Sequence, residues 1–345
     1  MSYLNEPLRI RELAIKNRIV MPPMCQNAAG DDGKPNDWHF VHYASRAIGG
    51  AGLIIVEMTD ITKESRGSDT NLGLWSDEQV PAFARLVRAV QSNGARIAIQ
   101  IAHAGRKSEA DEPVGPTEEP HSDAFKKPRA LSTAEVGAVA ARFADAARRA
   151  VEAGFDAIEL HGAHGYLIHQ FHSPAINKRT DEYGRDLARF GVEVVRAVKR
   201  EMPAGMPLLM RVSAVEYKDG GYDIDHMIEI AKRYKEAGVD VFHVSSGGDG
   251  PIGRRKPGTH AGYQLPFARR IREAVGGPVI AVGNLDHAEV AEAALANGDA
   301  DLVSVGRGML RDPYWALRAI QQIDGAVRPP KSYETAFARA RSAMS

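Results

Sequence analysis

The stretch IELHGAHGYLIHQFHSP, Ile158–Pro174, decides how this chain is interpreted. It starts within a short apolar run, Ala157–Leu160, and continues as a polar, glycine-spaced cluster that contains His161, His164 and Tyr166. This order is typical of the carboxyl end of a buried strand that opens into a functional site. Two imidazoles and a phenol offer hydrogen-bond donors, a proton donor or metal ligands. A histidine-rich loop that only caps a strand is the simpler alternative, but three polar rings exceed what a cap needs.

Apolar runs of the same kind recur along the chain and alternate with stretches of helical period. They are short and rich in β-branched residues, as strands buried on both faces are. The clearest helix is expected over 133–154, where Ser132 or Thr133 caps the start and Gly154 takes the left-handed position at the end. The eight expected strands are Arg18–Met24, Leu53–Glu57, Arg96–Ile101, Ala157–Leu160, Leu208–Val212, Val241–Val244, Val279–Val282 and Leu302–Val305.

A weak internal repeat indicates how these strands are connected. EAGFDAIELH, EAGVDVFHVS and NGDADLVSVG each lead from a helix end through glycine and aspartate into a strand. Repeated β/α units favour a closed (β/α)8 TIM barrel over an open doubly wound sheet, which predicts a GxGxxG turn that is absent here. Residues 1–17 predict a small hairpin that closes the bottom of the barrel, and 105–131 predict a long loop on the site side. We therefore expect a single domain over residues 1–345.

Composition excludes several classes of function. The chain has 44 Lys plus Arg and 44 Asp plus Glu, so no net charge favours nucleic acid or an anionic membrane. It contains neither a long apolar run nor a signal-peptide pattern, and Cys25 is the only cysteine. A cytoplasmic protein that acts on small molecules is the expectation.

Polar or small residues follow most of the expected strands, where a barrel carries its site. The seventh and eighth strands end in Gly283 and in Gly306-Arg307, and this pattern predicts a phosphate site. Cys25, after the first strand, is a buried small hydrophobe, a reactive thiol or a group that tunes a cofactor. The other residues at strand ends are Met24, Gln100, His103, His161, His164 and Arg211.

The histidines also suit a second interpretation. His161 and His164, with Glu159 before them and His169 and His172 after them, would suit a metal-dependent barrel hydrolase. A catalytic metal would also need acidic residues at other strand ends, where this chain has Gln100 and Arg211. We rank this alternative second.

At these residues the chain resembles the old yellow enzyme family of FMN-dependent ene reductases, in its bacterial, thermophilic-type branch. The resemblance covers nearly the whole chain. Its motifs are specific in combination: KNRIVMPPMC (16–25), WHFVHYASRAIGGAGLIIVE (38–57), LGLWSDEQ (72–79), QIAHAGRK (100–107), ELHGAHGYLIHQFHSPAINKRTDEYG (159–184) and DLVSVGRGMLRDP (301–313).

The resemblance implies FMN over the mouth of the barrel, reduced by NADPH or NADH. His161 and His164 would bind the carbonyl oxygen of an α,β-unsaturated substrate, hydride would pass from the flavin to the β-carbon, and Tyr166 would give a proton to the α-carbon. Cys25 would adjust the flavin potential. The residues implied to hold FMN are Pro22, Pro23, Met24, Cys25, Met58, Gln100, Arg211, Gly283, Gly306 and Arg307.

The chain departs from the family pattern at several positions. Asn27 replaces a tyrosine expected to bind the substrate, and Met58 replaces a small residue against the flavin. The loop after DEYG is shortened to RDLARF. Thr335 stands where relatives place an arginine that reaches a neighbouring subunit, a role that Arg339 or Arg341 would take over. The implied partners are a small activated alkene and further copies of the chain in a dimer or tetramer.

Overall fold

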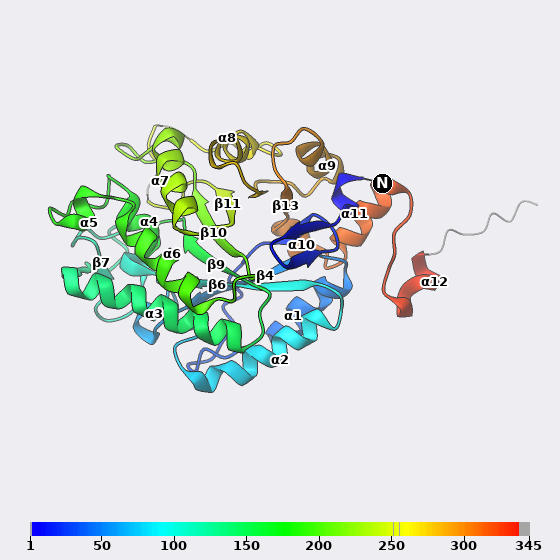
Figure 1. The fold of residues 1–345 in the computed structure, drawn as a ribbon, viewed down its shortest axis with the longest axis horizontal. Coiled ribbons are helices and arrows are strands. Elements are labelled where there is room, and N and C mark those ends of the chain that lie inside the picture. The colour runs from blue at the N-terminus through cyan, green and yellow to red at the C-terminus, as the bar shows by residue number, and fades with distance from the viewer. Residues whose placement is uncertain (1, 251, 255, 338–345) are drawn as a thin grey trace, which may run out of the picture.

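The computed structural model describes residues 2–250, 252–254 and 256–337 of the chain. Eight parallel strands close into a barrel, because β3 pairs with β4 on one side and with β13 on the other. Helices surround the barrel (Figure 1), so the predicted TIM barrel is confirmed. The barrel strands are β3 (Ile19–Met21), β4 (Leu53–Asp60), β6 (Arg96–Ala102), β9 (Ala157–Gly162), β10 (Leu208–Ser213), β11 (Val241–Ser245), β12 (Val279–Ala281) and β13 (Leu302–Ser304).

All eight expected strands are present, and the sequence misjudged only their ends. β3 stops at Met21 rather than Met24, since Pro22 and Pro23 have no N–H to continue the ladder. β4 runs on to Asp60, and its pairing with β6 shifts register between Val56 and Thr59, so that Met58 lies within the irregularity.

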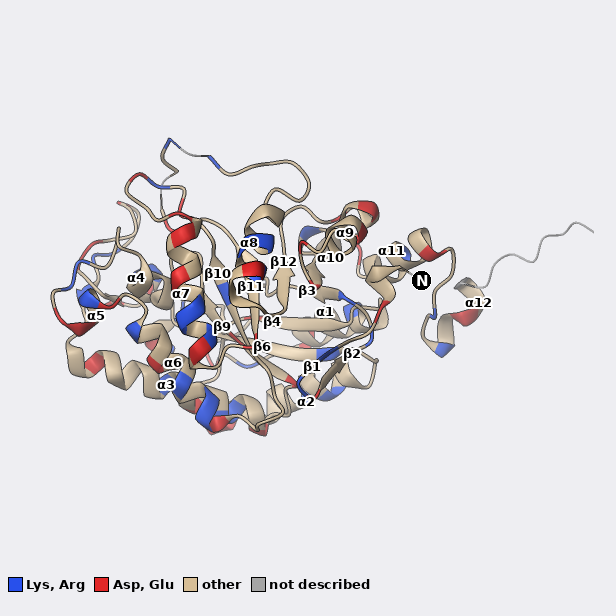
Figure 2. Cartoon of the chain, turned by 45° about the horizontal axis from the view of Figure 1, so that its top comes forward, with Lys and Arg blue, Asp and Glu red and all other residues tan. Residues whose placement is uncertain are grey.

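The outer layer consists mainly of amphipathic helices, and the cartoon in Figure 2 marks charged residues along these helices, whereas the barrel strands are largely tan. In α3 the predicted cap is confirmed: the Ser132 side chain accepts the Glu135 N–H, and Gly154 has φ +88° beyond the end. No described helix is long and apolar enough to cross a membrane. The helices are α1 (Asp37–Ile48), α2 (Val80–Gln91), α3 (Thr133–Glu152), α4 (Leu167–His172), α5 (Glu182–Arg185), α6 (Arg189–Glu201), α7 (Ile224–Ala237), α8 (Leu265–Val275), α9 (Ala288–Ala296), α10 (Arg307–Arg311), α11 (Trp315–Asp324) and α12 (Glu334–Phe337).

The predicted N-terminal hairpin is also confirmed. β1 (Leu8–Ile10) and β2 (Leu13–Ile15) pair antiparallel. Ile10, Leu13 and Ile15 join a buried cluster with side chains from all eight barrel strands. The hairpin therefore buries apolar surface at the amino ends of the strands and leaves the carboxyl ends for the site.

The long segment 105–131 follows β6, as expected, and carries little regular structure. Its short strand β7 (Val114–Gly115) pairs with β8 (Arg129–Ala130), while a further short strand, β5 (Leu72–Gly73), extends the barrel sheet beside β4. Arg106, at the start of the segment, is almost completely buried despite its charge.

Candidate active site

A cleft opens at the carboxyl ends of the barrel strands. It collects residues that lie on or just after β3, β10, β11, β12 and β13, which are far apart in the sequence. Most residues predicted to hold FMN lie here. The cleft is lined by Pro22, Pro23, Met24, Arg211, Ser245, Gly283, Asn284, Ser304, Gly306 and Arg307, among others.

One end of the cleft has the features predicted for a phosphate site. Gly283 has φ +123°, a conformation that favours glycine, and Gly306 lies close enough to Met24 that an added Cβ would come 3.3 Å from its Sδ. The exposed Arg307 guanidinium is hydrogen-bonded to the Asn284 side chain. The structure thus brings Gly283, Gly306 and Arg307 together, with backbone amides and a cation available to an anion.

Next to Arg211 of the cleft lining, a group of buried polar residues lies on the neighbouring barrel strands. Gln100 Nε2 donates to Glu159 Oε1 at 2.8 Å, and His243 Nδ1 lies 2.8 Å from Glu159 Oε2. Glu159, considered above as a metal ligand, is therefore engaged with neighbouring side chains. Burial lowers the pKa of the adjacent Arg211 guanidinium, and Glu159 opposes that shift.

His161, His164 and Tyr166 converge as the sequence predicted. The His161 ring centroid lies 5.3 Å from that of His164 and 4.6 Å from that of Tyr166, both edge to face. Burial first, and then the Arg211 charge, keeps the His161 pKa well below its usual value, so the ring is neutral. Because Ala163 N–H donates to His161 Nδ1 at 3.2 Å, the ring proton is on Nε2. His161 is therefore a neutral hydrogen-bond donor.

His164 is held in an unusual backbone conformation, with φ +56°. Its N–H donates to Ser213 Oγ at 3.0 Å, and its carbonyl accepts from Lys107 Nζ at 3.0 Å. Its Nε2 lies 2.8 Å from Ser245 Oγ, a residue that also lines the cleft. The side chain therefore faces the cleft from the loop after β9.

The Tyr166 ring is held from two sides. Met58 packs in a small apolar cluster with Ala102, Ala104 and Tyr166, and Lys107 Nζ lies 4.7 Å from the centre of the tyrosine ring. Burial raises the Tyr166 pKa above its usual value. Sequence analysis missed Lys107; its place five residues after the end of β6, within the motif QIAHAGRK, was the available signal.

The segment after β3 places Cys25 and Asn27 at the rim, where both are exposed. Although part of the Cys25 surface is exposed, the surrounding protein excludes enough water to raise the pKa of the thiol to about 12, and the charges of Glu57 and Asp60 add to that shift. Asn27 has φ +50°. Met58 contacts Tyr166 rather than lining the cleft described above.

Metal-type ligands gather elsewhere among the described residues. The cluster of three consists of His169, Glu216 and Asp249, all buried, and it includes neither His161 nor His164. His172 Nδ1 instead lies 3.1 Å from the Tyr234 hydroxyl. The set proposed above for a metal hydrolase is thus divided between two separate places.

Comparison with known proteins identifies the family. A profile of the NADH:flavin oxidoreductase / NADH oxidase family matches residues 3–325. The chain belongs to this family. NADPH dehydrogenase of Geobacillus sp. is 44% identical over 96% of this chain and 98% of its own length, and that of Listeria monocytogenes is 43% identical over 98% and 100%.

Solved structures agree with this assignment. Morphinone reductase superposes with a TM-score of 0.81 at 29% identity, over 96% of this chain and 92% of that one. A 2-naphthoyl-CoA reductase complex gives a TM-score of 0.87 at 26% identity and covers 95% of this chain, which spans about half (52%) of that longer chain. The protein is thus a flavin-dependent oxidoreductase of the old yellow enzyme group, related to NADPH dehydrogenases, and its cofactor is FMN.

The residues of the cleft fit this cofactor. Arg211 Nε and Ser304 Oγ are buried polar atoms with no partner among the described residues, and both side chains line the cleft. Glycine backbone, Arg307 and Arg211 all line this cleft. Arg211 there would stabilise negative charge on a reduced flavin ring.

The shortened segment RDLARF runs from the last residue of α5 into the first turn of α6. Thr335 is exposed on α12, whereas Arg339 and Arg341 lie outside the described residues.

Proposed function

We propose that this protein reduces activated alkenes, namely α,β-unsaturated carbonyl or nitro compounds, using NADPH or NADH. When bound, FMN would supply the hydride chemistry that links the nicotinamide to the alkene β-carbon. Pro22, Pro23, Met24 and Cys25 would lie along the flavin, and Met58 would lie beside it. Gln100 and Arg211 would bind its ring, while Gly283, Gly306 and Arg307 would bind its phosphate.

The observation that carries this proposal is the neutral, donor-ready His161 beside His164 and Tyr166. His161 Nε2–H would donate to the substrate oxygen together with His164, and Asn27 would contact the substrate from the rim. Such donors withdraw electrons from the alkene and stabilise the developing enolate. Because both rings stay neutral through burial, they can donate without losing a charge as the pH changes around neutrality.

Tyr166 would then give its phenolic proton to the α-carbon. Its raised pKa keeps the phenol protonated at neutral pH. Lys107, held over the ring, would fix its orientation and favour the negative charge left after the proton has moved.

Half-reactions test the roles separately. Tyr166→Phe keeps the ring and should slow flavin reoxidation by 2-cyclohexenone by about 10²-fold or more while leaving reduction by NADPH nearly intact. Equal losses in both halves would refute the proton-donor role. Replacing His161 or His164 should weaken phenol binding and abolish its long-wavelength absorption band with oxidised flavin, whereas replacing the exposed His287 should do neither.

A flavin-binding protein without this activity is the competing class. It would be yellow but would not oxidise NADPH when an enone is added, so that assay with the purified protein decides between the two.

We also propose that residues 1–345 form one FMN-binding domain that works in the cytoplasm as a homo-oligomer. Light scattering of the purified full-length chain tests the assembly, and a monomeric mass would refute it.

A further inference from the structure

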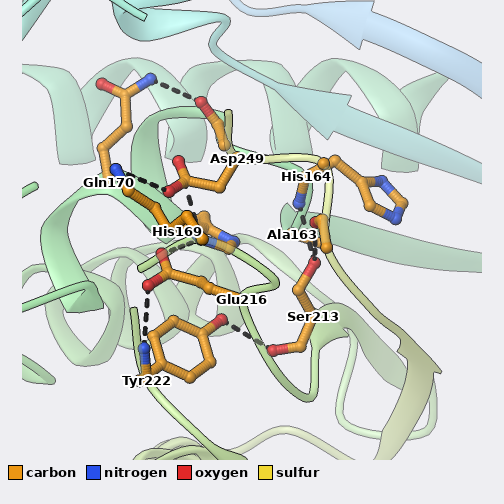
Figure 3. A network of polar contacts seen from close by, with 12 residues as sticks. Ala163, His164, His169, Gln170, Ser213, Glu216, Tyr222 and Asp249 are labelled. Carbon is orange, nitrogen blue, oxygen red and sulfur yellow. Dashed lines mark hydrogen bonds and ion pairs between the residues drawn. The ribbon is translucent and has the colours of Figure 1, made fainter. Parts of the chain in front are cut away.

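We propose that the buried cluster of His169, Glu216 and Asp249 positions His164 for substrate binding, with Asp249 as the positioning residue at its centre (Figure 3). The inference rests on the proposed function, since it concerns the residue that would bind the substrate oxygen. Asp249 lies in the loop after β11 and His164 in the loop after β9, so the contact joins two different β/α units.

His164 needs an external support because its backbone is strained. Both His164 (φ +56°) and Gly165 (φ +73°) are left-handed, and a residue with a Cβ seldom adopts that conformation unless its surroundings impose it. Ser213 Oγ on β10 accepts its N–H, and Lys107 donates to its carbonyl. These two bonds fix the peptide groups on either side of the histidine.

The loop after β11 supplies the third support by direct backbone packing. A Cβ added to Gly248 would lie 2.8 Å from His164 Cα and Cβ, and one added to Gly165 would lie 3.0 Å from Asp249 Cα. The two loops are therefore in contact without side chains between them. Any shift of Gly248 or Asp249 has to move His164.

Asp249 is what anchors this loop. Arg106 Nη2 donates to both the carbonyl and Oδ1 of Asp249, each at 3.2 Å, and Lys218 Nζ lies 3.5 Å from Oδ2. On another side, His169 Nε2 lies 4.0 Å from Asp249 Oδ1. Asp249 thus receives contacts from the loop after β6, from α4 and from the loop after β10.

The cluster leads back to His164. His169 Nε2 lies 2.8 Å from Glu216 Oε1, and Glu216 Oε2 accepts the Tyr222 N–H at 3.0 Å. The Tyr222 hydroxyl donates to the Ser213 carbonyl at 2.7 Å, and Ser213 holds His164 and also donates to the Gly247 carbonyl at 2.8 Å. The contacts therefore run in a circuit through the loops around His164, as Figure 3 shows in part.

The charges explain why this cluster serves as a support rather than as a metal site. Two carboxylates, Glu216 and Asp249, are matched by Arg106 and Lys218, both of which contact Asp249 directly. A divalent ion would add two positive charges to a buried site that is already balanced. The ligand-like spacing of the three side chains is thus accounted for by the ion pairs of Asp249 with Arg106 and Lys218 and by the hydrogen bond between His169 and Glu216.

The expected effect of losing the Asp249 charge follows from a change in conformer population. If His164 adopts the substrate-binding conformer in only about one molecule in ten, the apparent affinity for a ligand that hydrogen-bonds to His164 falls about tenfold. Once the substrate is bound, the competent conformer is restored. KM should therefore rise far more than kcat falls.

Asp249→Asn in the FMN-loaded protein tests this. Phenol Kd and enone KM should each rise about tenfold, with kcat reduced less than about threefold and the flavin spectrum without phenol unchanged. Gly248→Ala, which places a methyl group against His164 without altering a charge, should likewise raise phenol Kd and enone KM much more than it lowers kcat. Asp219→Asn is the matched control: its carboxylate accepts the Arg254 N–H in the same loop but has no described contact with His164, and phenol affinity should not change.

Three outcomes would overturn the inference: unchanged phenol affinity in both variants, a loss of kcat at unchanged KM, or a metal-dependent rise in melting temperature that Asp249→Asn abolishes. If wild-type protein itself gives no absorption band with phenol, the proposed function fails instead. The two failures are therefore distinguishable.

Discussion

Replacing Glu57 with glutamine is expected to remove a pH dependence from the stability of the fold. Glu57 is fully buried on β4, below the segment that carries Cys25. Its Oε2 accepts the Tyr43 hydroxyl at 2.7 Å and its Oε1 accepts the Gln26 N–H at 2.9 Å. The nearby His39, 3.8 Å away, supplies no charge at neutral pH because burial lowers its pKa to about 4.

The magnitude follows from the proton that Glu57 retains on folding. Burial raises its pKa from 4.5 to about 7, against the two hydrogen bonds that favour the carboxylate. Between these values the folded protein holds a proton that the unfolded chain has lost. The Glu57 contribution is therefore fully present below pH 4.5 and is lost as the pH rises through 7, a decline of roughly 3 kcal/mol.

Glutamine stays neutral and keeps the shape of the protonated acid. Its oxygen can accept the Gln26 N–H, while its amide faces the Tyr43 hydroxyl, which loses its acceptor at a cost of about 1 kcal/mol at every pH. Relative to wild type, Glu57→Gln should therefore gain roughly 2.5 kcal/mol between pH 5 and pH 8, because part of the decline has already occurred by pH 5.

Urea unfolding of the FMN-loaded proteins at pH 5, 6, 7 and 8 measures this difference. Taking the variant minus the wild type cancels other buried acids, such as Asp60, whose pKa burial also raises. Glu229→Gln, at an exposed pair with Lys232, should leave the curve unchanged. Wild-type and Glu57→Gln curves that run parallel from pH 5 to pH 8 would refute the reasoning.

Further predictions concern the residues around the site. Met58→Ala opens space beside Tyr166 and should lower the free energy of unfolding by about 2–5 kcal/mol. It should also slow reoxidation of the flavin by an enone more than its reduction by NADPH. A stability loss with a normal rate of reoxidation would contradict this. Cys25 should react slowly with iodoacetamide at pH 8, because its pKa is about 12, and faster in Glu57→Gln, because one of the charges that raises the pKa is gone; mass spectrometry checks both rates. Asn27→Tyr should raise kcat/KM for 2-cyclohexenone and lower it for maleimides. It should also lower the free energy of unfolding by about 1 kcal/mol, because φ is +50° at this position. Equal losses of kcat/KM on both substrates would mean that Asn27 serves only its loop.

The sequence by itself determined the barrel. Buried parallel strands appear in the sequence as short runs of β-branched residues. The repeated order of helix, glycine and strand indicates that the strands run parallel to one another. The cap at Ser132 and the end of β3 at Pro22 also follow from the local chemistry of one or two residues. The family motifs added the identity of the cofactor and of most candidate site residues.

Only the tertiary structure decided how those residues are set against one another. The neutral state of His161 near Arg211, the packing of Met58 and Lys107 around Tyr166, and the support of His164 by Asp249 all depend on residues from different β/α units. Periodicity and capping report the conformation of a few neighbouring residues. These local patterns contain no information about which side chains, tens to more than a hundred residues apart in the sequence, come into contact when the barrel closes. The chemistry of this site depends on those contacts.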